Sequence, residues 1–114
     1  MRQGSTQTIE ILCNTYGIGI SEISKICLTI SKNNNSPMLT IHDFDRFTLE
    51  MQEDNRVKAT IKLKEDETLN LPIGTLMLQI KFGLLTGDVI VSNILDIEVE
   101  SGLCKQPMFG VEGA

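Results

Sequence analysis

The segment from Leu63 to Phe82, which decides the fold, reads LKEDETLNLPIGTLMLQIKF. Its first residue ends an alternating strand, and the charged run that follows predicts a turn. Pro72 and Gly74 then break the chain. From Leu76 onward, apolar residues occupy every second position, and this period of two predicts a strand. One segment therefore supplies an edge of the core, a corner and a central strand.

Outside this segment the same alternation recurs in both directions along the chain. With the strand at 76–82, six strands are clear, and a seventh is expected between Met38 and Phe44. The other five are at 6–13, 23–31, 46–52, 57–63 and 89–99. Segment 23–31 also fits a helical stripe, but its β-branched residues and the Asn/Pro cluster after it favour a strand.

The last strand has an irregularity at its centre. Its pattern predicts a bulge or bend at Ser92 and Asn93. The residues expected on one face of this strand are Val89, Val91, Leu95, Ile97 and Val99.

Short strands separated by turn signals predict two packed antiparallel sheets rather than a helical or α/β fold. We expect residues 1–102 to form this sandwich, with a short polar N-terminal arm. Residues 103–114 form an apolar but aperiodic tail. Such a tail is either folded back on the sandwich or kept for a partner.

Length and charge exclude several classes of protein. A chain of 114 residues fits one domain with a real hydrophobic core. Its net charge of −5 opposes approach to nucleic acid or to an anionic membrane, so we expect neither as a partner. No apolar run is long enough for a membrane span, and none resembles a signal peptide.

No constellation for catalysis or metal binding is visible. Cys13, Cys27 and Cys104 have no close spacing, so we interpret them as reduced thiols with no disulfide or metal role. His42 is the single histidine, which leaves no basis for a catalytic triad or a zinc site. The acidic corner at 65–67 lacks the loop of a calcium site. We therefore expect no catalytic residue, no cofactor and no metal.

Two short motifs carry a resemblance to a known group. The opening from Arg2 to Thr8, RQGSTQT, resembles the Arg-Gln-Gly-Thr-Thr-Pro start of small proteins encoded in phage and prophage tail regions of Gram-positive bacteria. The corner LKEDETL at 63–69 and the LQIK at 78–81 are similar to the Leu-Thr-Gln-Glu-Asp-Thr-Leu and Gln-Ile-Arg patterns of that group. Those proteins in turn resemble the immunoglobulin-like N-terminal domain of siphophage upper baseplate proteins.

The resemblance implies an immunoglobulin-like antiparallel β-sandwich of six to seven strands. The likeness is one of topology, since the chain lacks the Trp and the cysteine spacing of an antibody domain. It also implies a non-enzymatic tail or baseplate component, made in the bacterial cytoplasm and carried in the virion once assembled. Its partners would be other phage tail or baseplate proteins, and a homo-oligomer stays open.

Both ends of the chain are candidates for assembly contacts. The arm is polar and has no core position before Ile9, and the tail is apolar, so either end could dock on a neighbouring subunit. The residues expected to make these contacts are Arg2, Gln3, Leu103, Met108, Phe109 and Val111. An alternative function is a small ligand-binding module, with a glycan as the expected ligand, although the chain has few aromatic residues for stacking.

Overall fold

The computed structural model describes residues 1–32 and 37–101. In chain order the described elements are β1 (Gln7–Asn14), η1 (Ile20–Glu22), β2 (Ile23–Ser31), β3 (Pro37–Ile41), η2 (Phe44–Arg46), β4 (Phe47–Met51), β5 (Arg56–Leu63), α1 (Glu65–Leu69), β6 (Gly74–Leu84), β7 (Val89–Val91) and β8 (Leu95–Val99). The turn predicted at 33–36 and the tail residues Leu103, Cys104, Met108, Phe109 and Val111 lie outside the described residues.

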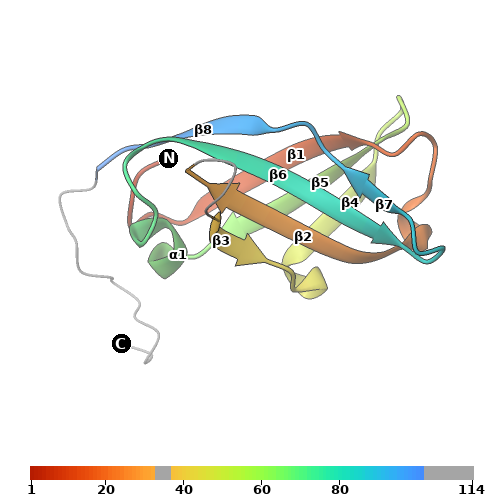
Figure 1. Ribbon diagram of the computed structural model, residues 1–114, viewed down its shortest axis with the longest axis horizontal. Helices are drawn as coiled ribbons and strands as arrows, with labels where there is room; N and C mark the ends of the chain where they lie inside the picture. Colours follow the sequence, from red (N-terminus) through yellow and green to blue (C-terminus); the bar gives the residue numbers. More distant parts are fainter. Residues whose placement is uncertain (33–36, 102–114) are drawn as a thin grey trace.

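The strands form two antiparallel sheets that pack as a sandwich (Figure 1). One sheet has the order β1-β5-β4, and the other has β3-β2-β6 with both β7 and β8 on the far side of β6. If β1 is equated with strand B of an immunoglobulin domain, these orders become B-E-D and C′-C-F-G, with β7 and β8 sharing the place of G. The predicted immunoglobulin-like sandwich is therefore confirmed, and the described residues form eight strands rather than six or seven.

The core lies between the sheets and follows the alternation in the sequence. Inward residues of the two central strands are almost completely buried, because each strand has neighbours on both sides and a sheet above it. These residues are Val57, Ala59, Ile61 and Leu63 from β5 and Leu76, Leu78, Ile80 and Phe82 from β6. The segment 23–31, which also fitted a helix, is the strand β2 and buries Ile26, Leu28 and Ile30 in the same core.

The corner after β5 differs from the prediction in one respect. The charged run expected to be a turn is the single-turn helix α1. The acidic residues in its first turn interact favourably with the positive end of the helix dipole. Pro72 prevents the helix from continuing. Leu71, two residues beyond the helix, is buried in the core. The corner is thus a compact unit. The sequence did not reveal its helix, because five residues are too few to show a helical period.

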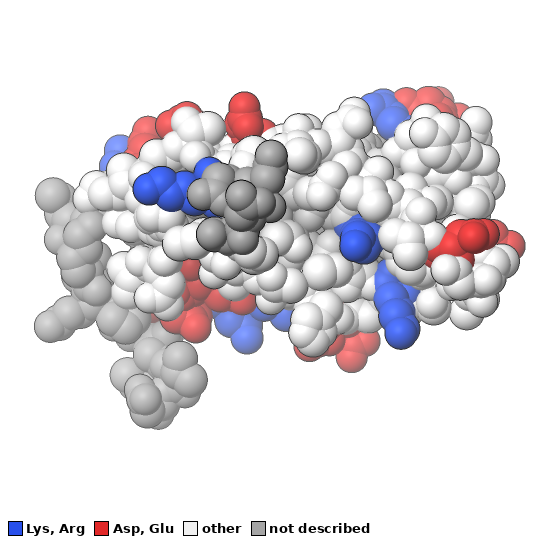
Figure 2. All heavy atoms as spheres, viewed as in Figure 1, with Lys and Arg blue, Asp and Glu red and all other residues white. Residues whose placement is uncertain are grey.

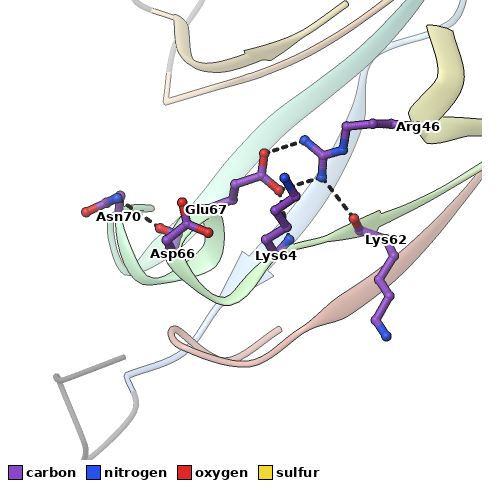
Figure 3. A network of polar contacts seen from close by, with 6 residues as sticks. All are labelled: Arg46, Lys62, Lys64, Asp66, Glu67 and Asn70. Carbon is purple, nitrogen blue, oxygen red and sulfur yellow. Dashed lines mark hydrogen bonds and ion pairs between the residues drawn. The ribbon is translucent and has the colours of Figure 1, made fainter. Parts of the chain in front are cut away.

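An ion pair fixes this corner to the β4 edge of the three-stranded sheet (Figure 3). Arg46, at the end of η2, points its guanidinium at the Glu67 carboxylate and also donates to the backbone oxygen of Lys62, 3.0 Å away. Glu67 in turn accepts from the backbone N–H of Lys64 at 2.8 Å. Burial alone would raise the pKa of Glu67, but the bonds from Arg46 and Lys64 outweigh it and hold that pKa below its ordinary value.

The last predicted strand is divided into β7 and β8 at the expected place. However, the residues of β7 face the opposite way from the prediction. Val91 pairs with Lys81, and Leu95 pairs with Leu78. Two residues of β6 lie between Leu78 and Lys81, whereas three residues, 92–94, lie between Val91 and Leu95. This extra residue is a β-bulge, and a shift of one residue exchanges the two faces of a strand. The prediction that Val89 and Val91 face inward with Leu95 was therefore wrong. Both valines face solvent, and Ile90 packs on the core instead.

Candidate functional site

The outer surfaces of the two sheets have opposite characters. On the three-stranded sheet the outward positions are polar or charged except for Leu12, and Lys58 of β5 lies between Glu10 of β1 and Glu50 of β4. Its Nζ is 4.0 Å from a Glu10 oxygen and 3.6 Å from a Glu50 oxygen. Exposed pairs of this kind keep a sheet surface solvated and add little to stability. This surface is thus an ordinary solvent-exposed sheet face.

The outer face of the five-stranded sheet is mostly uncharged. In Figure 2 this face is turned toward the viewer, and white atoms cover most of its middle, with acidic groups toward the edges. We call this surface the outer face. Its outward neutral residues, by strand register, are Cys27, Thr29, Met38, Thr40, Met77, Gln79, Val89 and Val91.

The bulge between β7 and β8 adds apolar area to the outer face. Ser92 holds the bulge in place: its backbone N–H donates to the Ile80 oxygen at 2.9 Å, and its Oγ accepts from the Ile80 N–H at 3.0 Å. The Gln79 side chain donates to the Ser92 oxygen at 2.9 Å. Val89 and Val91, on the outer side of β7, are 55% and 46% exposed. Apolar residues gathered on one face of a small domain are typical of a protein-binding surface.

Two depressions lie on the outer face. The smaller, of about 120 Å³, is lined in part by Met77, Gln79 and Ile94. The larger, of about 550 Å³, lies toward the β6–β7 turn and is lined by Lys25, Ile26, Cys27, His42, Lys81, Gly83 and Val89. Its lining includes no carboxylate, so its charged groups are all basic. Lys25 lies over Gly83, where a Cβ would come 3.2 Å from that of the lysine.

The larger depression brings together Cys27 and His42, which the sequence places 15 positions apart. A nucleophile and a base also need a group that orients the base, and no carboxylate is among the lining residues. Within residues 1–32 and 37–101, no group of three His, Cys, Asp or Glu side chains is arranged to hold a metal ion. The two lysines of the lining, Lys25 and Lys81, could hold a negatively charged group.

The N-terminal arm lies against its own domain. Arg2 forms a parallel bridge with Glu100, just after β8, and its guanidinium is 3.3 Å from the Glu100 carboxylate. The Gln3 side chain donates to the Leu71 oxygen at 2.6 Å, and the Thr68 hydroxyl donates to the Ser5 oxygen at the same distance. The arm thus joins the corner around α1 to the end of β8.

This arrangement bears on the predicted assembly contacts. Arg2 and Gln3 lie beside Glu100 and Ser101, the last residues that the structure describes. The Arg2 side chain is largely exposed even while paired. The tail positions predicted as contacts, Leu103, Met108, Phe109 and Val111, lie beyond the described part of the chain.

Sequence reasoning missed the outer face. The signal was present in the middle outward positions of β2 and β6, which carry Cys27, Thr29, Met77 and Gln79, with Lys25 and Lys81 at one end only. The contribution of Val89 and Val91 was hidden, because it depends on the bulge.

Comparison with protein-family models, with curated proteins and with solved structures finds no match for this chain. Among the described helices, none has the length and apolar character needed to cross a membrane.

Proposed function

We propose that the protein is a non-enzymatic structural component of a phage or prophage, of the tail or baseplate region, which acts by assembling with other protein subunits. The observation that carries the assembly role is the outer face, where uncharged residues and two outward valines cover one side of an acidic chain. The phage origin depends on the resemblance of residues 2–8, 63–69 and 78–81 to tail-region proteins. In this proposal the chain is made in the bacterial cytoplasm and incorporated into the virion.

The fold and the position of the ends are compatible with such a role. A sandwich presents two flat faces and its edge strands to neighbours, and the arm lies beside Glu100, at the end of β8. A neighbour could therefore be held by the outer face, by that end, or by both. The partners proposed are other tail or baseplate proteins.

A glycan-binding module is the second candidate, since the larger depression has a volume suited to a small ligand. However, no Phe, Tyr or Trp is among its lining residues, whereas sugar rings commonly stack on such rings. For this reason we propose assembly ahead of glycan binding.

The direct test is to look for the protein in purified tail particles. A strain that produces such particles would carry either the natural gene or one encoding a double variant, Val89→Asp with Val91→Asp. Antibody detection should find the natural protein in the particle fraction and the variant in the unassembled fraction. A natural protein that never sediments with particles would contradict the proposal.

Measurements of mass in solution test whether the tail contributes to association. Light scattering of the full chain and of a chain ending at Ser101 compares their association, because the shorter chain keeps every described strand and helix. Loss of association on truncation would assign the contact to residues 102–114. Equal association would assign it to the described domain.

A further inference from the structure

The charges on the outer face are separated along the strands. Lys25 and Lys81 lie at the end of the face near the β6–β7 turn, and both line the larger depression. Asp96 and Glu98 lie on β8, toward the start of β6, and Glu98 is fixed on this face by a hydrogen bond from the Thr75 hydroxyl. The middle of the face, around Gln79, is neutral. Lys32 directly follows β2, which is on the opposite side of β6 from β8.

The strand register gives these charges a particular geometry. Asp96 pairs with Met77, so it is one strand and four residues away from Lys81 on β6. Lys25 pairs with Gly83 and Glu98 pairs with Thr75, so these two charges are two strands and eight residues apart, in the same direction. The second separation is thus the first one doubled. Both midpoints fall at the level of Gln79.

This pattern is self-complementary. Consider a twofold axis that lies in the plane of the face, crosses the strands and passes Gln79. This axis places Lys81 of one chain opposite Asp96 of the other. The same axis places Lys25 opposite Glu98. With strands about 4.8 Å apart and residues rising about 3.3 Å, the axis tilts about 20° from the perpendicular to the strands. The two sheets would then cross at roughly 40°, near the aligned packing of sheets.

We propose that the outer face binds a second copy of this chain, forming a twofold symmetric dimer in which each depression that contains Lys25 and Lys81 receives Asp96 and Glu98 of the other copy. Each ion pair then occurs twice, as the symmetry requires. The neutral residues around Gln79, together with Met77 and Val91, form the centre of the contact. This inference depends on the charges and apolar residues of the face, and it holds whatever larger structure the protein joins.

The size of the face sets the strength of the dimer. Four strand widths and about eight residues of length give roughly 500 Å² in projection on each chain. Stable interfaces bury about 800 Å² on each partner, so the dimer should be weak and concentration-dependent. We expect a dissociation constant on the order of 10–100 µM, which added salt should weaken by screening the ion pairs.

Charge reversal tests the arrangement. Sedimentation velocity of the full chain, from about 5 µM to about 500 µM, should show a reversible monomer–dimer equilibrium. Lys81→Glu alone and Asp96→Lys alone should each weaken the dimer about tenfold or more, because each puts like charges opposite one another twice.

An equal mixture of these two variants should dimerise. In the mixed dimer the two introduced charges, which are opposite in sign, face one another at one contact, and the natural Lys81 and Asp96 face one another at the other. The double variant, Lys81→Glu with Asp96→Lys, should dimerise with itself, since both of its contacts join opposite charges.

Matched controls carry the same changes of charge elsewhere. Lys62→Glu on the outer side of β5 and Glu53→Lys in the β4–β5 turn should leave the dimer unchanged. Circular dichroism and thermal unfolding of every variant check that each is folded. A natural chain that stays monomeric throughout this range would overturn the proposal and leave the face to a different protein. A dimer that both single variants retain, or a mixture that fails to associate, would also overturn it.

Discussion

The guanidinium of Arg46 makes two parallel hydrogen bonds to the carboxylate of Glu67, 2.6 Å from Nη1 to Oε2 and 2.7 Å from Nη2 to Oε1. The side chains are 20% and 14% exposed, so the pair is largely removed from water. Two-pronged bonds of this kind are strong and directional. The pair therefore connects η2, before β4, with α1, after β5, and holds the corner against the edge of the three-stranded sheet.

Replacement of Arg46 should destabilise the fold. In Arg46→Met the Glu67 carboxylate stays largely buried and loses its cation, and the Lys62 oxygen loses a donor. We expect the free energy of unfolding to fall by about 2 kcal/mol, measured by urea denaturation. Arg56→Met is the matched control, because its partner Asp54 is two residues away on an exposed turn. If both variants lost the same stability, the corner pair would have no special role.

Acidification should weaken the fold through Glu67. Because the folded-state pKa of Glu67 is below its ordinary value of 4.5, its stabilising effect is complete above that value and is lost as the pH falls through the lower, folded-state pKa. Urea midpoints measured from about pH 7 to about pH 3 should therefore decline at the acidic end. The decline should be smaller in Glu67→Gln, which has no proton to gain. Identical pH profiles for the two proteins would contradict this origin.

Ser92 should be needed for the bulge. In Ser92→Ala the Ile80 N–H loses the side-chain oxygen 3.0 Å away, in a buried setting. The unfolding free energy should fall by about 1–2 kcal/mol. Ser24→Ala is a suitable control, since the Ser24 hydroxyl donates from an exposed position to the Gly83 oxygen. Amide exchange should quicken around Gln79 and Ile80 in the first variant alone.

Thr68 should hold the N-terminal arm. Its side chain is completely buried, and its hydroxyl donates to the oxygens of Ser5 and Glu65 at 2.6 and 3.1 Å. Thr68→Val keeps the shape of the side chain but removes the donor, so the Ser5 oxygen loses this bond. We expect a loss of about 1–2 kcal/mol and faster proteolysis within the arm before β1. Thr86→Val, in the exposed turn after β6, should change neither quantity.

The strands could be predicted from sequence because their signal is local. In β5 apolar and polar residues alternate without interruption, and in β6 only Met77 interrupts the alternation; the buried residues of both strands are those that the alternation selects. The short helix α1 was missed because a single turn of helix has no measurable period. The inward orientation of Val89 and Val91 was predicted wrongly because one extra residue in the bulge exchanges the faces.

The candidate surface required the register of the whole sheet. Lys81 and Asp96 have matching positions on either side of Gln79 only because β8 pairs with β6 at Met77, and that pairing is fixed by the position of the bulge. The Arg46–Glu67 pair spans 21 positions, and the Arg2–Glu100 bridge spans 98. No local pattern encodes such contacts. What the sequence did contain was a neutral stretch at the outward positions Cys27 and Thr29 of β2 and Met77 and Gln79 of β6, between the charged ends of the face.

The parallel bridge at Arg2 has a mechanical consequence. The Glu100 N–H donates to the Met1 oxygen, the Gln3 N–H donates to the Glu100 oxygen, and the Arg2 guanidinium donates to the Ser101 oxygen. Because the two segments run in the same direction, pulling the chain at both ends slides one past the other. These bonds then share the load and must break together, instead of opening one after another. A domain built this way resists tension along the line through its ends before any strand of the core is disturbed.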